Sequence, residues 1–241
     1  MRYGIISDIH GNLEALEAVI HALSRERIDK YLCAGDIVGY GADSGECIKK
    51  TRALNPIVIC GNHDAASSGL IDTSNFTEPA KNAVKWTKKH LNANDASFLR
   101  GLDFVFKNKH LALVHGTLEE PEEFNYIFDS EMAQKTFDLM DSPVCFVGHS
   151  HCPLIFSYKN NAVKISNDMK ADLSSAEKLI VNVGSVGQPR DGDPRLCYSI
   201  YDTDRGSVRL KRLSYDVSKA QRKIVDAGLP AAFAYRLGVG R

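Results

Sequence analysis

No charge of one sign predominates in this sequence, because 30 Lys and Arg residues balance 30 Asp and Glu residues over 241 positions. The chain as a whole therefore produces no field that would draw it to nucleic acid or to an anionic membrane, and any anion it binds must be attracted by a local site. No apolar run approaches the roughly 20 residues that a membrane-spanning helix needs. Internal repeats and low-complexity linkers are also absent, so we expect one compact domain over residues 1–241.

The six cysteines form no C-x-x-C pair, so the sequence has no paired-thiol motif. Cys33, Cys60 and Cys145 lie within apolar runs, where free thiols behave as small hydrophobic side chains. The sequence opens directly on a strand-like run over residues 2–6, so we expect no signal peptide. Reduced cysteines and the expected lack of a leader together predict a cytoplasmic protein.

Apolar residues make up 44% of the sequence and charged residues 25%, which is the composition of an ordinary soluble globule. The first 65 residues alternate between strand-like and helix-like segments, and Asn12 is placed to cap the first helix. The expected strands are 2–7, 29–34 and 56–60, and the expected helices are 13–23 and 43–54. Such alternation with short connections predicts right-handed βαβ units on a mostly parallel sheet.

Strand patterns dominate the second half of the sequence. We expect helices at 78–92, 95–100 and 130–140, and strands at 103–107, 110–114, 144–147, 154–158, 162–166, 178–183, 196–202 and 207–213. A last helix is expected at 216–227, before a tail without a clear pattern. The segments 66–76 and 117–128 are polar and irregular, and we expect them to be loops that wall a pocket and set specificity. The pattern thus predicts one domain with two sheets.

Polar side chains follow five of the strand-like runs, at the point where each run ends. They are Asp8 and His10, Asp36, Asn62 and His63, His115, and finally His149 and His151. The carboxyl ends of parallel strands meet at one edge of a sheet, so these groups are expected to gather there. Side chains two apart on an extended segment point the same way, which lets such a pair hold one centre. Oxygen and nitrogen donors without a thiolate suit manganese, iron, zinc or similar ions.

Each motif taken alone also has an ordinary structural explanation. An Asp-x-His pair at a strand end can be a cap or a buried histidine, and residues 61–64 can be simple turn chemistry. The order and placement of all five clusters favour a common site. The other histidines, His21, His90 and His110, lie on expected helices or at a strand start, where surface or packing roles suffice.

The complete series of motifs resembles the calcineurin-like metallophosphoesterase superfamily, and most of all its small bacterial and archaeal phosphodiesterase branch. The matching motifs are Asp8-x-His10, Gly35-Asp36, Gly61-Asn62-His63-Asp64, His115-Gly116, Gly148-His149-x-His151 and the Gly-rich stretch 182–190. The resemblance implies an α/β fold of the α+β kind, a four-layer αββα sandwich in which two mixed β-sheets are flanked by helices. It also implies two metal ions on the rim of that sandwich.

The resemblance assigns a role to each of these residues. It implies that the first metal is held by Asp8, His10, Asp36 and His151, and that the second is held by Asp36, Asn62, His115 and His149. His63 matches a histidine that lies over the substrate without binding metal, and the adjacent Asp64 is expected to fix its tautomer and raise its basicity. The expected cofactors are two divalent transition-metal ions, with manganese first and iron, zinc, nickel or cobalt as alternatives.

One departure from the wider superfamily concerns the residues after Asp36. The Ser/Thr protein phosphatases carry an Asp-Arg pair shortly after the bridging aspartate, whereas residues 36–41 here contain no arginine. This argues against the protein-phosphatase branch and against the symmetric dinucleoside-tetraphosphate hydrolases that resemble it. Tyr40 and Arg190 are the candidate substrate contacts, with Arg195 as an alternative to Arg190, although both arginines can equally be solvated loop residues.

The expected reaction is hydrolysis of a small phosphoester, and above all of a phosphodiester. A hydroxide shared by the two metals would attack phosphorus in line, and His63 would protonate the departing alkoxide. The alternatives are a catalytically silent scaffold of the same fold and a nuclease or nucleotide phosphatase. The stretch Arg209–Lys223 is basic, but a solvated strand and helix face explains it, so we expect neither nucleic acid nor a membrane as a partner. The oligomeric state is left open.

Overall fold

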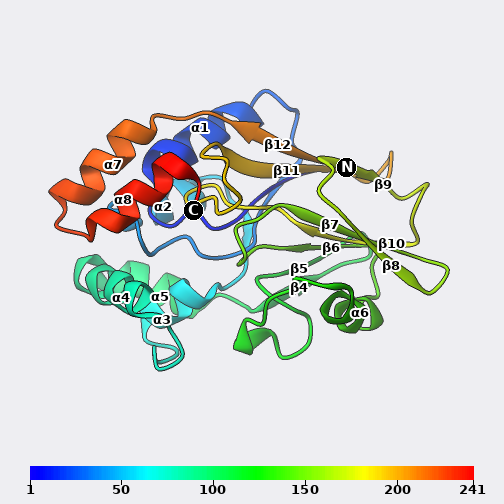
Figure 1. Ribbon diagram of the computed structural model, residues 1–241, viewed down its shortest axis with the longest axis horizontal. Coiled ribbons are helices and arrows are strands. Elements are labelled where there is room, and N and C mark those ends of the chain that lie inside the picture. The colour runs from blue at the N-terminus through cyan, green and yellow to red at the C-terminus, as the bar shows by residue number, and fades with distance from the viewer.

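Two six-stranded β-sheets packed face to face form the centre of the protein, in a computed structural model that describes residues 1–241 (Figure 1). The first sheet contains, in spatial order, β3 (Ile57–Val58), β2 (Lys30–Cys33), β1 (Arg2–Ile6), β11 (Leu196–Asp202), β12 (Ser207–Leu213) and β9 (Lys170–Asp172). The second contains β4 (Val105–Lys107), β5 (Ala112–Val114), β6 (Val144–Val147), β10 (Lys178–Asn182), β7 (Leu154–Lys159) and β8 (Ala162–Ser166).

Both sheets are mixed, and each has three neighbouring parallel strands. In the first sheet these are β1, β2 and β3, and in the second they are β5, β6 and β10. The remaining strands pair antiparallel, as β1 does with β11. The carboxyl ends of the parallel strands therefore lie together, as the strand–helix alternation predicts. The expectation of a mostly parallel sheet is wrong, because three of the five strand pairs in each sheet are antiparallel.

The alternation of side chains along β1 explains how one strand serves two layers. Tyr3 and Ile5 point into a cluster of 18 buried residues between the two sheets, whereas Ile6 points to the opposite face, toward the helices. Gly4 lies on that helical face, and a Cβ atom there would come within 2.9 Å of the Leu23 side chain. The missing side chain lets the helix approach the sheet closely.

Helices cover the outer faces of both sheets, which confirms the four-layer sandwich. On the first sheet lie α1 (Leu13–Leu23) and α2 (Ser44–Ala53), and the expected cap is present because Asn12 Oδ1 accepts a hydrogen bond from the backbone N–H of Ala15. On the second sheet lies α6 (Ser130–Asp138), which buries Phe137 against the strands. No helix is long and apolar enough to span a membrane.

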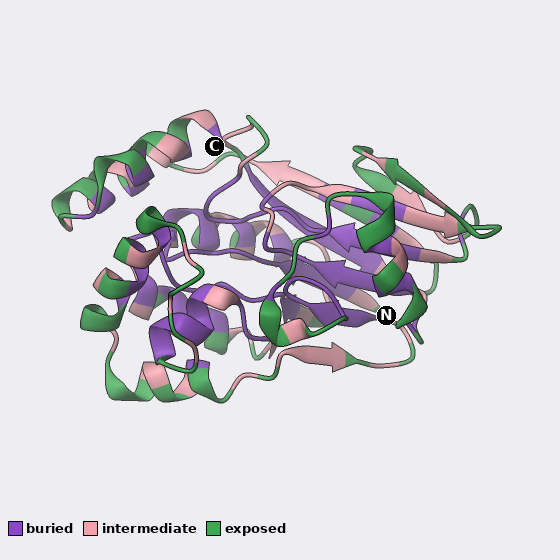
Figure 2. Cartoon of the chain, turned by 60° about the horizontal axis from the view of Figure 1, so that its bottom comes forward, coloured by how far each residue is buried: buried purple, intermediate pink, exposed green.

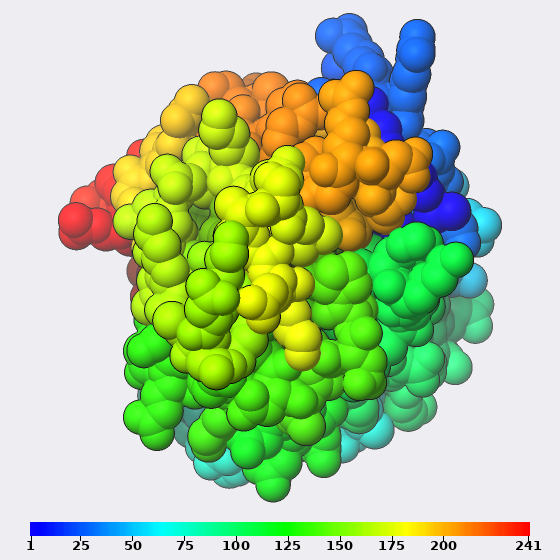
Figure 3. Space-filling view, turned by 90° about the vertical axis from the view of Figure 1, so that its right-hand side faces the viewer, coloured from blue at the N-terminus to red at the C-terminus, as the bar shows by residue number.

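The remaining helices gather at the end of the sheets where β1 to β3 finish, on the left of Figure 1. They are α3 (Asn62–Ser68), α4 (Glu78–His90), α5 (Ala93–Arg100), α7 (Val217–Asp226) and α8 (Ala231–Val239), with a short 3₁₀ turn, η1, at Pro121–Glu123. Figure 2 shows that the loops between these helices and the sheets are largely buried. Figure 3 shows the opposite end, which is covered by segments around β7–β8 and β11–β12.

Three expectations about local structure are wrong. The segment 66–76 is not entirely loop, because α3 continues to Ser68, and the tail after residue 227 forms α8. Strand β9 has no counterpart among the expected strands. All three elements are nine residues or shorter and depend on partners distant in sequence, as β9 does on β12. Periodicity over so few residues is a weak signal.

Candidate metal centre and active-site cleft

The loops that follow β1, β2 and β6 adopt a backbone conformation that side-chain-bearing residues rarely use. Their positive φ angles occur at Asp8 (53°), His10 (49°), Asp36 (55°), Tyr40 (56°), His149 (67°) and His151 (60°). Each such residue costs about 1–3 kcal/mol and persists only where its surroundings hold it. Hydrogen bonds that continue the parallel pairing past the strands, such as the Asp8 N–H to the Gly35 carbonyl at 3.0 Å, provide that support. Strain of this kind concentrates at functional sites.

One group of side chains brings together Asp8, His10 and His151, all fully buried. The Nε2 atom of His151 lies 3.2 Å from Asp8 Oδ1, and the Nε2 atoms of His10 and His151 face each other at 3.0 Å. Asp8 Oδ1 has no hydrogen-bond donor. The residues after β1 and β6 therefore converge on one point. The two-residue spacing is not the reason, because these residues are not extended, and His149 faces the other group rather than the centre of His151.

The hydrogen bonds of the Nδ1 atoms show which ring nitrogen of each imidazole faces the candidate metal centre. In three of the rings, Nδ1 lies next to a backbone carbonyl oxygen. The distance is 3.0 Å from His10 to Val38 and 2.5 Å from His151 to Gln188. The Nδ1 atom of His115 contacts the Ala34 carbonyl in the same way. A carbonyl only accepts hydrogen bonds, so each Nδ1 carries the proton. In neutral His10 and His151, two Nε2 lone pairs then face each other. That arrangement is repulsive unless a cation lies between them, so the donor set fits a divalent metal ion.

A second group consists of Asp36, His115 and His149, joined by Asn62. His115 Nε2 lies 3.4 Å from Asp36 Oδ2 and 3.2 Å from Asn62 Oδ1. Asp36 Oδ2 is also 3.6 Å from His10 Nε2 in the first group. Asp36 is thus the carboxylate that lies between the two groups.

The charges of Asp36 and His115 stabilise each other. Burial alone would raise the pKa of Asp36, but the imidazole of His115 opposes this and holds the pKa well below its ordinary value. Burial would likewise lower the pKa of His115, yet Asp36 raises it to about 9. By contrast, burial keeps the pKa values of His10 and His149 well below normal, so both rings are neutral at pH 7.

His63 lies beside the centre, on the first turn of α3. Its side chain packs on the rings of Tyr40, at 4.6 Å between centroids, and Phe76, at 5.5 Å. Gly39 (φ 96°) makes room for it, since a Cβ there would be 2.6 Å from His63 Nδ1. Burial and the nearby Arg190 lower the pKa of His63 to about 4 although Asp36 opposes them.

Asn62 and His63 follow the expected strand 56–60 but do not continue it. Gly61 is the N-cap of α3, and both residues are helical. Successive side chains on a helix point about 100° apart, so Asn62 reaches His115 while His63 turns toward Tyr40. The two side chains therefore diverge.

The expected pairing of Asp64 with His63 is also wrong. The Asp64 carboxylate accepts hydrogen bonds from the backbone N–H groups of Val38, at 3.2 Å, and Gly61, at 3.3 Å. His63 Nδ1 is buried without a hydrogen-bond partner. Burial, reinforced by the charge of Asp36, raises the pKa of Asp64 to about 7. Asp64 therefore ties the loop after β2 to the start of α3.

A cleft of about 710 Å³ opens above the two groups, and its walls come from residues 70–77 and 122–126, within or next to the two segments expected to wall a pocket. Of the candidate substrate contacts, Tyr40 and Arg190 line the cleft. The Arg190 guanidinium lies 5.6 Å from the centre of the Tyr40 ring. Arg195 is not among the lining residues and forms an ion pair with Asp193 at 2.6 Å.

Sequence reasoning missed Tyr126, which stacks face to face on His149 with ring centroids 3.9 Å apart. Its other neighbour in the stack is Phe128. Both rings come from the acidic loop 117–128, whose composition shows nothing that would distinguish an aromatic at the site from one on the surface.

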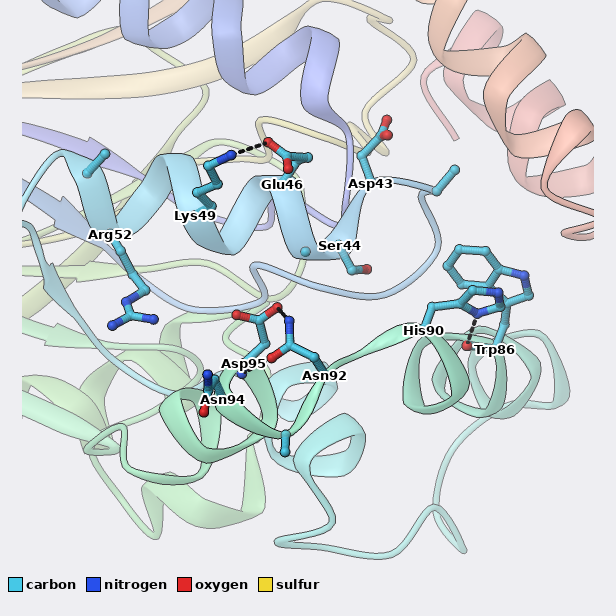
Figure 4. A pocket seen from close by; sticks show the side chains of 14 residues that line it. Asp43, Ser44, Glu46, Lys49, Arg52, Trp86, His90, Asn92, Asn94 and Asp95 are labelled. Atoms are coloured by element: carbon cyan, nitrogen blue, oxygen red, sulfur yellow. Dashed lines mark hydrogen bonds and ion pairs between the residues drawn. The ribbon is translucent and has the colours of Figure 1, made fainter.

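A second hollow of about 1100 Å³ lies between α2 and the α4–α5 pair (Figure 4). Several of its polar side chains pair with one another, as in the Asn92–Asp95 hydrogen bond at 2.7 Å and the Glu46–Lys49 ion pair at 3.5 Å. A third group that could hold a metal ion consists of His10, Asp36 and His63, and all three groups lie under the other cleft. The chemistry therefore belongs to the cleft above Asp36.

Fold and site together define a phosphoester-hydrolysing enzyme of a metal-dependent class, and the comparisons with known proteins agree. Residues 1–206 match the calcineurin-like phosphoesterase superfamily domain, and the chain belongs to this family. It is 37% identical, over 98% of its length and 97% of the relative, to the uncharacterized protein MJ0912 of Methanocaldococcus jannaschii.

Two solved structures resemble the chain over its whole length. The metallophosphoesterase from Sphaerobacter thermophilus is 38% identical, with a TM-score of 0.87 over 100% of this chain and 99% of that one. The hypothetical protein PH1004 from Pyrococcus horikoshii OT3 is 21% identical, with a TM-score of 0.81 over 100% and 98%, and shares the fold.

Proposed function

We propose that the protein is a dinuclear metal-dependent phosphodiesterase that acts on small phosphodiesters. The observation that carries the proposal is the pair of donor groups that meet at Asp36 beneath one cleft. Asp8, His10, Asp36 and His151 would hold one ion, and Asp36, Asn62, His115 and His149 the other. Nitrogen and oxygen donors suit manganese first, with iron, zinc, nickel or cobalt as alternatives.

Two bound metal ions would make the local charge of the site positive. Two divalent ions would bring four positive charges against the two carboxylates, would lower the pKa of a water nucleophile and would offset charge on the phosphate oxygens. The buried loops around Asp8 and Asp36 exclude bulk water, which strengthens attraction between the site and an anion. A protein with no net charge can thus bind phosphate at this one point.

The side chains of the cleft supply what hydrolysis needs besides metal. We place His63 beside the leaving oxygen, to which it donates a proton. Its pKa of about 4 leaves it neutral at pH 7, but an anionic phosphoester beside the ring favours the imidazolium form and raises that pKa. Arg190 and Tyr40 line the same space and contact the phosphate or its substituent.

The lining of the cleft favours a diester over a polyanion. Arg190 is the only Lys or Arg among the lining residues, whereas Asp72, Glu122 and Glu123 stand along the walls. These carboxylates repel substrates with several negative charges. A phosphodiester carries a single charge, and the space between the walls accommodates its second substituent when that group is neutral or cationic.

Four of the six basic residues in the stretch 209–223 are engaged in ion pairs, which supports a small substrate rather than nucleic acid. Lys211 pairs with Glu26, and Arg212 pairs with Asp191. Lys223 lies 2.8 Å from Glu14. Neutralised in this way, the stretch presents no continuous basic face to a polyanion.

The test begins with chelator-treated protein reloaded separately with each candidate metal. We expect two ions per chain and a kcat/KM for bis(4-nitrophenyl) phosphate that exceeds the value for 4-nitrophenyl phosphate. Asp36→Asn should abolish both metal binding and hydrolysis, while the matched variant Asp95→Asn, in the second hollow, should behave as wild type. Two bound ions without hydrolysis of any ester would support the silent scaffold instead.

A further inference from the structure

The hairpin of helices α7 and α8 lies outside residues 1–206, the part of the chain that matches the family domain. The structure from Sphaerobacter thermophilus nevertheless corresponds to the whole of this chain, hairpin included. The two helices lie beside α1 and α2, with the C-terminus directed toward the loops at the ends of the strands (Figure 1). Their inner side is buried and their outer side is exposed (Figure 2).

Polar contacts join the hairpin to three helices, α1, α2 and α4. Lys223 of α7 lies 2.8 Å from Glu14 at the start of α1 and 2.7 Å from Asp43, the N-cap of α2. Trp86 of α4 donates its indole N–H to the Ala227 carbonyl at 3.1 Å. The hairpin is therefore held against the helices that surround the cleft.

The apolar side of the hairpin closes over Tyr40. Phe233 of α8 is only 1% exposed, and its ring meets the Tyr40 ring edge to face with centroids 5.2 Å apart. Tyr40 in turn contacts His10, at 4.9 Å edge to face, and His63, at 4.6 Å. Its positive φ gives it a strained backbone that needs such support.

Tyr40 thus links the metal groups to the hairpin. The Arg190 guanidinium lies against the same ring, 5.6 Å from its centre. A proposed metal ligand, the proposed proton donor and the proposed phosphate contact all touch Tyr40, and the buried Phe233 ring also packs on it. The hairpin itself does not line the cleft.

We propose that Phe233 is a positioning residue for the reaction, because it holds Tyr40 against His63 and Arg190; this inference rests on the proposed function. Shortening Phe233 leaves space behind the Tyr40 ring, which then moves away from His63 and Arg190. A shift of about 1 Å in groups that orient a substrate can lower a rate by about 100-fold. The metal ligands keep their own backbone supports, so the metal content is unchanged.

The test compares Phe233→Ala and Phe233→Leu with the matched variant Leu229→Ala, which removes a buried side chain from the same apolar cluster but makes no ring contact with Tyr40. We expect Phe233→Ala to lower kcat on the diester about 10- to 100-fold, with two metal ions retained. Phe233→Leu should lower kcat several-fold. Leu229→Ala should leave kcat within about twofold of the wild-type value. Fluorescence of Trp86, the only tryptophan, should report a docked hairpin in all three.

A second readout does not depend on activity. In protein labelled with ¹³C at the histidine rings, Phe233→Ala and Phe233→Leu should shift the signals of His63 and His10, and Leu229→Ala should not. This spectrum decides the inference even if the wild type hydrolyses no ester, and Phe233→Leu decides it if Phe233→Ala does not fold. Equal losses of kcat in Phe233→Ala and Leu229→Ala, or unshifted His63 signals in both Phe233 variants, would overturn it.

Discussion

Removal of the His63 side chain should separate proton transfer from metal binding. The His63 backbone N–H donates to Asp36 Oδ1 at 2.8 Å, and His63→Ala keeps this contact because only the ring is lost. We therefore expect two metal ions per chain in the variant. The lost proton donor should lower kcat by about 10²–10⁴-fold on an ester with a poor leaving group. This corresponds to about 2.7–5.4 kcal/mol of transition-state stabilisation at about 1.36 kcal/mol per tenfold.

The dependence on the leaving group distinguishes this role from a structural one. A nitrophenolate leaves with little protonation, so His63→Ala should lower kcat for a nitrophenyl diester by less than about tenfold. The assay measures kcat for an alkyl and a nitrophenyl diester side by side, with metal content by elemental analysis and the exposed His90→Ala as control. A loss of metal, or an equal loss of kcat on both esters, would refute the reasoning.

Three further predictions rest on the same geometry. Asp36 raises the pKa of His115 to about 9, so a metal ion must displace a proton from this ring in order to bind. The metal affinity should therefore rise with pH from 7 to 9, and calorimetry in two buffers should detect the released proton. An affinity that does not change with pH would contradict this. Asn62→Ala should deplete the second ion alone, measured as about one ion per chain; loss of both would contradict the two-group arrangement. Asp64→Asn should lower the free energy of unfolding by about 1–3 kcal/mol, since its amide N–H₂ would face a backbone donor. It should leave the leaving-group dependence unchanged, and a changed dependence would restore Asp64 as the partner of His63.

The sequence alone determined the succession of strands along the chain and the polar residues that follow them. Short apolar runs that end in Asp, Asn or His are local patterns, and a parallel arrangement brings their ends together whatever the details of packing. For this reason the gathering of Asp8, Asp36 and His149 at one edge was predictable, whereas the sandwich was implied only by the family resemblance. Asn12 capped its helix as expected, because a cap depends only on residues three positions away.

Only the tertiary structure decided which neighbours each polar group meets. Asp64 is adjacent to His63 in sequence, but it bonds to the backbone of Val38, 26 residues away. Arg190 and Arg195 are indistinguishable as loop arginines until Asp193 engages one of them. Phe233 gains its contact with Tyr40 from a helix too short to show a clear period. Hydrogen bonds and ring contacts of this kind join segments distant in the chain, and they form only when the core brings those segments together.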